Sequence, residues 1–402
     1  MGRVADRFRR VRDVRGGLLA TIAFGWFLTL GARFLLPAVL PAIKATFAID
    51  DATAGLAITV VWVGYGLMQF PAGVLVDRFD GRTLLSLSLL LSGTSLAVVG
   101  AAPDVPVFLV ACGLFGLSTG LFGTSRGIAL STFFRSNRGV AFGVALAAGS
   151  FGSAALPFLG SVVTDAADWR AAAGLTVPLF LATAASTWWV VPARPGDGDG
   201  GTGLSTATVV RTLRRGVTER AVAVGLAGLT VMLFTYQALT AFLPTYLIRA
   251  KGLSGQTAAA LFALLFVAGA GFQLAAGTAA DRVGTRPVVV AIAAVGVVTL
   301  AALPFVGGVV PLALLILVMS SRVAMASVMN PYIIGALPEE ATGTAWGLVR
   351  TGLFLVGATG STVVGALADR GLFDEAFYLL AVLTALATAL FVFLPAAGAD
   401  GE

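Results

Sequence analysis

The sequence predicts an all-α integral membrane protein in which twelve transmembrane helices form two six-helix bundles related by an internal repeat. Three observations predict this fold. Hydrophobic residues make up 58% of the chain and charged residues only 11%, whereas about a quarter of the residues of a soluble domain are charged. Apolar segments long enough to cross about 30 Å of hydrocarbon recur along the chain. A charged motif occurs twice, and the two copies are 204 residues apart.

The repeated motif combines a glycine, an Asp-Arg pair and a further arginine, and it lies between two apolar segments. A glutamine precedes each copy by four residues. Agreement of this many positions at one fixed offset indicates a duplicated unit. The first copy consists of Gly73, Asp77, Arg78 and Arg82 after Gln69, and the second of Gly277, Asp281, Arg282 and Arg286 after Gln273.

The chain begins with a basic tail, residues 1–16, which contains six arginines. The apolar segment that follows, about residues 17–42, is longer than the apolar core of a signal peptide and has no clear small-residue cleavage site, so we expect a retained helix. Five further spans of this half are expected near residues 55–77, 83–102, 106–132, 140–163 and 171–192.

A change of composition separates the two halves. Residues 195–208 are rich in Gly, Asp, Ser and Thr, which predicts a flexible linker. Six spans follow near residues 221–248, 257–280, 287–306, 310–336, 344–366 and 376–394. We therefore expect bundles at 17–192 and 220–395, a linker at 193–219 and a second tail at 396–402.

The charges in the loops predict the orientation. If the N-terminus is cytoplasmic, most of the 26 Lys and Arg residues lie on the cytoplasmic side, as the positive-inside rule requires. Both termini and the linker are then expected on the cytoplasmic face of a cell membrane, inner or plasma. The net charge of +6 needs no nucleic-acid partner. The opposite loops hold only Lys44, Arg170, Arg249, Lys251 and Arg370.

Twelve spans in two repeats, with Gly-x-x-x-Asp-Arg after the second span and again after the eighth, resemble the major facilitator superfamily of secondary transporters. The resemblance covers about residues 17–395. It implies that the motif latches the two bundles at the cytoplasmic face, where a carboxylate can meet the positive N-terminus of another helix. The alternative is a solvated loop. The motif copies depart from the family pattern at Asp80, Gly81 and Thr285.

Charges inside a bilayer are costly and usually functional. All twenty Asp and Glu residues lie in tails, loops or the motif copies, and the chain has no histidine. Four arginines, in contrast, lie within the apolar spans: Arg33, Arg126, Arg322 and Arg350. Because a negatively charged ligand would supply the missing partner of these cations, we expect a small anionic substrate.

Arg33 and Arg322 are the deepest of the four. The family resemblance implies that spans 1, 4, 7 and 10 line a central cavity, so these two arginines are expected to bind substrate. The alternative is a structural role, in which the guanidinium caps carbonyl groups at a helix break near Pro37 or Pro331.

Arg126 and Arg350 lie closer to the span ends. Arg126 is a candidate for substrate binding or for a polar cytoplasmic gate, and Arg350 for substrate binding or for contact with lipid headgroups. Neutral candidates can hydrogen-bond a carboxylate or hydroxyl. They are Tyr65, Tyr236, Gln237, Asn330 and Tyr332, with Gln69 and Gln273 open between binding and gating.

A weaker resemblance, over about fifty residues, links the first two spans to the anion:cation symporter branch of the superfamily. It implies transport of organic anions or phosphate. The repeat offset pairs Arg33 with Gln237 and not with a second arginine, so a small carboxylate is favoured over a phosphate ester. The matching residues are Arg33, Pro41, Phe47, Gly55, Gly64, Tyr65, Gln69, Pro71, Gly73, Asp77 and Arg78.

Other functions are less well supported. With no histidine, one cysteine and no acid within the spans, the chain offers no nucleophile with its base and no metal site, so neither an enzyme nor a cofactor is expected. Multidrug or metabolite efflux is the alternative function, although residues 149–157 match the Gly-Pro-rich stretch of drug:proton antiporters poorly. We expect a monomer that works by rocker-switch alternating access. A proton or sodium ion as the coupling ion, exchange and facilitated diffusion all stay open.

Overall fold

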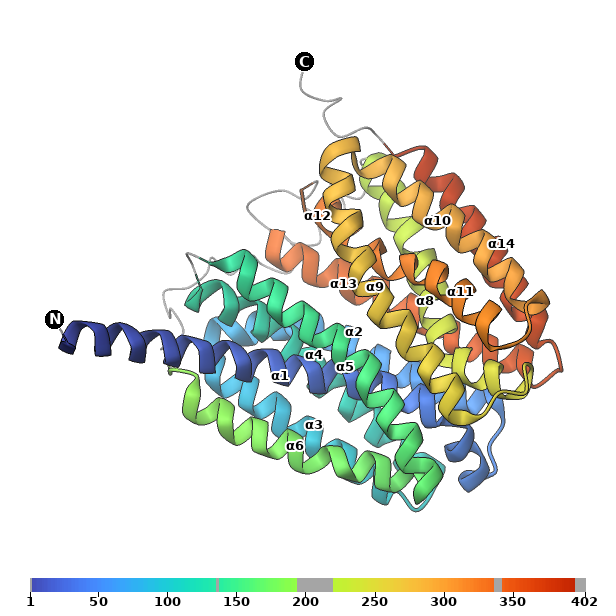
Figure 1. The fold of residues 1–402 in the computed structure, drawn as a ribbon. Helices are drawn as coiled ribbons and strands as arrows, with labels where there is room; N and C mark the ends of the chain where they lie inside the picture. Colours follow the sequence, from blue (N-terminus) through green and yellow to red (C-terminus); the bar gives the residue numbers. More distant parts are fainter. Residues whose placement is uncertain (1, 135–136, 194–219, 336–341, 395–402) are drawn as a thin grey trace.

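The computed structural model describes residues 2–134, 137–193, 220–335 and 342–394, and this part of the chain is built of helices (Figure 1). Twelve of the helical segments in these ranges are long and apolar enough to cross a membrane, which confirms the predicted fold class. The predicted linker, apart from its first residue, and the predicted tail at 396–402 lie outside the described residues, as do the side chains of residues 1–15.

The N-terminal bundle consists of six helices, one for each predicted span. The first of them continues without interruption from the basic tail and through two prolines, Pro37 and Pro41. The six are α1 (Gly2–Phe47), α2 (Asp51–Arg78), α3 (Gly81–Ala101), α4 (Val105–Phe133), α5 (Arg138–Ala166) and α6 (Trp169–Val190).

The C-terminal bundle also has six spans, but its fourth span is interrupted. A 3₁₀ segment, η2, separates α11 from α12 and so breaks the helix near the middle of the membrane. The elements are α8 (Arg220–Arg249), α9 (Gly255–Val283), α10 (Thr285–Ala302), η1 (Leu303–Phe305), α11 (Val309–Met319), η2 (Ser320–Ala324), α12 (Met325–Gly335), α13 (Thr342–Ala368) and α14 (Phe373–Val392).

Short polar residues set several helix starts, because their side chains accept hydrogen bonds from the free N–H groups of the first turn. Asp50 accepts a hydrogen bond from the Thr53 N–H at 2.8 Å, and this bond lowers the pKa of Asp50. Asp80, where the motif departs from its family pattern, caps α3 by accepting from the Thr83 N–H at 2.5 Å. The aspartate that departs from the family pattern therefore acts as the N-cap of α3.

The bundles meet at the end of the molecule remote from the termini, which we call the remote end (Figure 1). Asp369, just after α13, accepts hydrogen bonds from the backbone N–H groups of Asp51 and Ala52 at the start of α2, both at 2.7 Å. The Asp51 carboxylate is ion-paired with Lys44 and, at 2.5 Å, with Arg249 of α8. A carboxylate of one bundle thus satisfies a helix N-terminus of the other.

Close packing of α2 against α13 continues this contact along the membrane. Thr59 donates a hydrogen bond to the Ala358 carbonyl at 2.8 Å. A Cβ added to Gly55 would overlap the Ser361 backbone, so only glycine permits this approach. Towards the termini the two groups of helices diverge (Figure 1). The described helices are therefore joined at the remote end and spread apart towards the end that carries the termini, which we call the open end (Figure 1).

The glycine contact at the remote end provides a test of this closure. We expect Gly55→Leu to force α2 away from α13, because overpacking costs about 1–3 kcal/mol and would change the ratio of conformations by roughly 5- to 150-fold. Spin labels at Ala167 and Glu375, one in each bundle at the remote end, should then report longer distances. The single cysteine, Cys112, is buried and is replaced first.

Gly271→Leu is the matched control. A Cβ at Gly271 in α9 would meet no atom within 4 Å, so the same substitution should leave the label distance unchanged. Equal distances in Gly55→Leu and the parent protein would show that this crossing does not hold the remote end closed.

Candidate functional site

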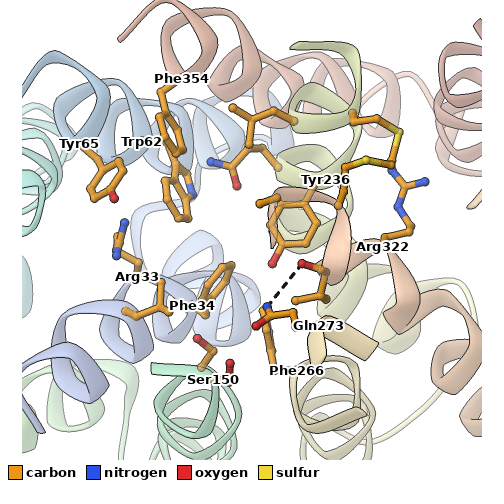
Figure 2. A pocket seen from close by; sticks show the side chains of 18 of the residues that line it. Arg33, Phe34, Trp62, Tyr65, Ser150, Tyr236, Phe266, Gln273, Arg322 and Phe354 are labelled. Carbon is orange, nitrogen blue, oxygen red and sulfur yellow. Dashed lines mark hydrogen bonds between the residues drawn. The ribbon is translucent and has the colours of Figure 1, made fainter. Parts of the chain in front are cut away.

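A cavity of about 240 Å³ lies between the two bundles (Figure 2). Residues of α1, α2 and α5 line it from the N-terminal bundle, and residues of α8, α9, η2, α12 and α13 from the other. Much of the wall is aromatic, with Phe34, Trp62, Phe266 and Phe354 around it. Ligand pockets usually measure about 300–1,000 Å³, so this cavity suits a small molecule with a compact apolar body.

Arg33 is the charged group deepest in this wall. It is 1% exposed, and its Nε donates to the Thr29 carbonyl at 3.1 Å. Its Cζ lies 4.2 Å from the ring centroid of Tyr65, 4.8 Å from that of Trp62 and 5.4 Å from that of Trp26. Figure 2 shows the guanidinium beside Tyr65. These rings stabilise the cation, yet Nη2 has no hydrogen-bond partner within the described part of the chain.

Two further arginines approach the same place from other helices. The Arg126 guanidinium, on α4, lies 4.1 Å from the centroid of the Trp26 ring, and its Nε and Nη1 have no partner among the described atoms. Arg350, on α13 of the other bundle, donates from Nη2 to the Tyr65 hydroxyl at 3.1 Å. Arg33 and Arg350 therefore both contact Tyr65, and Arg126 lies against the same Trp26 ring as Arg33. We call Arg33, Arg126 and Arg350 around Tyr65 the arginine cluster.

No carboxylate neutralises the arginine cluster within the described ranges. The ion pairs found there join Asp51 to Lys44 and to Arg249, at the remote end. The same ranges hold no group of three or more Cys, Asp or Glu side chains that could bind a metal ion. The cluster therefore presents positive charge and free N–H donors, which is the chemistry of an anion site.

Arg322 differs from the cluster. It lies on η2 and is 2% exposed. Its Nη2 donates to Thr235 of α8 at 2.6 Å and its Nη1 to Thr384 of α14 at 3.3 Å, while a Cβ at Gly296 of α10 would overlap the guanidinium. In Figure 2 the guanidinium points away from Arg33, beyond Tyr236. Arg322 lines the cavity, but its charge is held inside the C-terminal bundle.

The neutral residues predicted from sequence divide into two groups. Tyr65, Tyr236, Gln237 and Gln273 line the cavity. Gln237 is fully buried, and neither atom of its amide has a partner among the described residues. Gln273 donates to the Val323 carbonyl at 3.4 Å, drawn as the dashed line in Figure 2. Gln237 is thus the neutral polar group best placed to meet a ligand.

The other group lies away from the cavity wall. Gln69 is buried and donates to the Tyr65 carbonyl of its own helix at 3.0 Å. Tyr332 packs against the apolar core of the C-terminal bundle, and Asn330 lies nearby on α12. The structure does not bring these three side chains to the cavity, so their predicted roles stay predictions.

The motif residues lie at the open end. Arg78, Asp281, Arg282 and Arg286 are exposed, and Gly73 and Gly277 face open space. The Arg82 guanidinium stacks on Trp188 at 4.3 Å, while the Asp77 side chain is outside the described set. The described motif side chains form no ion pair with the opposite bundle. The predicted latch is therefore not tested by this conformation.

The tryptophan, phenylalanine and serine residues of the wall were not predicted from the sequence. Trp62 and Tyr65 are three residues apart on one helix face, and their ring centroids are 5.6 Å apart. Phe354 follows Arg350 by one helical turn, with 5.7 Å between ring centroid and Cζ. This spacing of aromatic and cationic residues was a usable signal. No pattern in the sequence distinguished Ser150 and Ser153 of α5, which also line the cavity.

Comparisons with known proteins agree with this architecture. A family model described as Major Facilitator Superfamily matches residues 22–332 and 252–401. Among solved structures, a bacterial homologue of the human lysosomal transporter Spinster, in an inward-facing and unoccupied conformation, has a TM-score of 0.78 at 15% identity. The alignment covers 95% of this chain and 97% of that one. At this identity the likeness concerns the fold.

Two relatives differ in how much of the chain they match. The fosmidomycin resistance protein of Escherichia coli (strain K12) is 24% identical over 393 residues, 94% of this chain and 93% of that protein. A probable hexose phosphate transport protein of Chlamydia muridarum (strain MoPn / Nigg) is 27% identical over 150 residues, 37% of this chain. The chain spans only about a third of that relative's length, 33%. With the family model matched over most of its length, the chain belongs to the Major Facilitator Superfamily of membrane transporters.

Proposed function

We propose that the protein is a secondary transporter that carries a small organic anion, bound at the arginine cluster, by rocker-switch alternating access. The observation that carries the proposal is the grouping of Arg33, Arg126 and Arg350 around Tyr65 and Trp26, beside a cavity between the bundles that Arg33 lines. Because no described carboxylate balances these charges, an anion is the partner that the site lacks.

The cluster also links binding to movement. Arg33 and Arg126 belong to the N-terminal bundle, and Arg350 belongs to the other. The bond between Arg350 and the Tyr65 hydroxyl already joins the two bundles. An anion that contacts Arg33 and Arg350 together would favour the conformation in which they are close, and a ligand shifts an equilibrium only through such differential contacts.

We expect the termini in the cytoplasm because of the loop charges, and in that orientation the structure opens inwards. The bundles at 17–192 and 220–395 would then rock about the cavity, with the linker at 193–219 connecting them. The remote-end contacts of Asp369 and Asp51 would close the outer gate. The Gly73 and Gly277 motifs would close the inner gate in the opposite conformation.

The names of the relatives bear on two points, the charge of the substrate and the direction of transport. One relative is named as a probable hexose phosphate transport protein, and a hexose phosphate is an anion, which supports an anionic substrate. The fosmidomycin resistance relative matches nearly the whole chain, which makes efflux the second candidate. The carboxylate favoured from sequence and the anion:cation symporter branch stay predictions, and the coupling ion is not assigned.

Removing a cluster arginine should abolish anion transport. We expect Arg33→Gln and Arg350→Gln to lower uptake of labelled anions by proteoliposomes at least about 30-fold, because loss of one partner of a buried charged pair costs about 2–5 kcal/mol. Arg370→Gln removes the same charge from an exposed residue at the remote end and should transport like the parent. Normal anion uptake by both cluster variants, or uptake restricted to neutral or cationic compounds, would refute the proposed function.

Arg322 should behave as a structural residue. Arg322→Gln cannot bond both Thr235 and Thr384, and each such bond to a charged group is worth about 1.5–3 kcal/mol. We expect a lower midpoint of thermal unfolding, with an unchanged KM for the anion in the protein that remains folded. The double substitution Thr235→Val with Thr384→Val should reproduce the effect. A normal unfolding midpoint together with a greatly raised KM would instead assign Arg322 to the substrate.

A further inference from the structure

We propose that the transported anion carries a tetrahedral dianionic head group, a phosphoryl or phosphonyl group, on a compact apolar body. This inference rests on the proposed function, because it names the class of anion that the arginine cluster would take. It departs from the carboxylate favoured by the sequence, where the repeat offset pairs Arg33 with Gln237 and not with a second arginine.

The positive charge of the arginine cluster favours a divalent anion over a monovalent one. Arginine stays protonated at any physiological pH, so the cluster holds three positive charges. A carboxylate would neutralise one of them and leave two cations in a membrane interior, where charge is costly. A dianion neutralises two, and Arg350 is the least buried of the three. The charge count therefore favours a divalent head group.

The N–H donors of the cluster that remain free also favour an oxyanion. Aromatic rings lie close to two guanidinium groups, those of Trp62 and Tyr65 beside Arg33 and that of Trp26 beside Arg126. Stacking satisfies a face, but the N–H donors lie in the guanidinium plane. Nη2 of Arg33 and Nε and Nη1 of Arg126 have no partner within the described ranges. In-plane donors of this kind bind oxyanions.

The arginines of the cluster come from three different helices, which favours a head group with three oxygens. The three arginines come from α1, α4 and α13, and Arg33 shares the Trp26 ring with Arg126 and the Tyr65 side chain with Arg350. A carboxylate offers two coplanar oxygens, whereas a phosphonyl or phosphoryl group offers three oxygens arranged as a tripod. Three guanidinium groups that approach from three helices match the tripod. Arg is also the residue used most for bidentate recognition of phosphate.

The cavity supplies the rest of the ligand's description. The wall next to Arg33 and Tyr65 is aromatic, with Phe34, Trp62 and Phe354. A cavity of about 240 Å³ accommodates a body no larger than a small ring or a short branched chain. Gln237, whose amide is unpartnered among the described residues, can accept or donate one hydrogen bond at the far side of such a body.

Matched phenyl compounds separate charge from shape. Binding of phenylphosphonate, benzenesulfonate, benzoate and benzamide to the purified full-length protein is measured at about pH 8 by tryptophan fluorescence, since Trp26 and Trp62 adjoin the cluster. At this pH the phosphonate is a tetrahedral dianion, the sulfonate a tetrahedral monoanion and the benzoate a planar monoanion. We expect phenylphosphonate to bind at least about tenfold more tightly than either monoanion.

Variants assign that preference to the cluster. Arg126→Gln and Arg350→Gln should each reduce the preference of phosphonate over sulfonate to less than about threefold, while sulfonate binding through Arg33 persists. Arg370→Gln, exposed and remote from the cavity, should keep the full preference. A thermal unfolding curve for each variant separates loss of binding from loss of folding.

The outcomes distinguish the two proposals. If benzoate or benzenesulfonate binds as tightly as phenylphosphonate, the dianionic head group is wrong while the anion transporter stands. If benzamide binds as well as the anions, or if no compound binds to the folded protein, both proposals fail. A phosphonate preference that survives in Arg126→Gln and Arg350→Gln would also overturn the assignment to this cluster.

Discussion

The organisation of this site depends on one constraint: three positive guanidinium groups lie together without a carboxylate partner among the described residues. Arg33 and Arg126 are buried and Arg350 is half-buried. Since arginine cannot lose its proton, the protein has to stabilise these cations in other ways. The rings of Trp26, Trp62 and Tyr65 lie within 5.4 Å of the Arg33 Cζ, and the Thr29 carbonyl accepts from its Nε. Pro37 lacks the N–H that would bond the Arg33 carbonyl in a regular helix, so the same turn of α1 keeps a polar backbone group beside the charge.

The contacts between the bundles at the remote end differ in kind from those near the cavity. At the remote end the contacts are charged and numerous, with the Asp369 carboxylate on the α2 N-terminus and Asp51 between Lys44 and Arg249. Glycine lets α2 and α13 approach closely there. Near the cavity the arginine cluster contributes one bond between the bundles within the described ranges, from Arg350 to Tyr65, beside the Thr351–Gly66 bond and the contacts of Phe354 with Trp62 and Tyr65. One bond of this kind can be exchanged for bonds to a ligand at little cost, whereas the remote contacts must break together.

The sequence predicts the fold well and the site less well, for physical reasons. Span length, hydropathy and the repeat offset are properties of single segments, so the twelve helices follow from them. The depth of an arginine in a span is equally readable, and all four interior arginines were identified. The direction of each side chain, however, depends on neighbours distant in sequence. Arg322 points into its bundle because Thr235 and Thr384 accept its N–H groups, and Arg350 reaches Tyr65 because α13 packs on α2. No local pattern around either arginine specifies those neighbours.

In the proposed mechanism the arginine cluster holds the transported anion. The most direct measurement is a crystal structure of the protein with a bound arylarsonate, whose tetrahedral head group contains an anomalously scattering arsenic atom. We expect one arsenic peak, with the arsonate oxygens within hydrogen-bonding distance of Arg33, Arg126 and Arg350 and the aryl ring against Trp62 and Phe354. An arsenic peak beside Arg322 or at the exposed motif arginines, with none at the cluster, would contradict this mechanism.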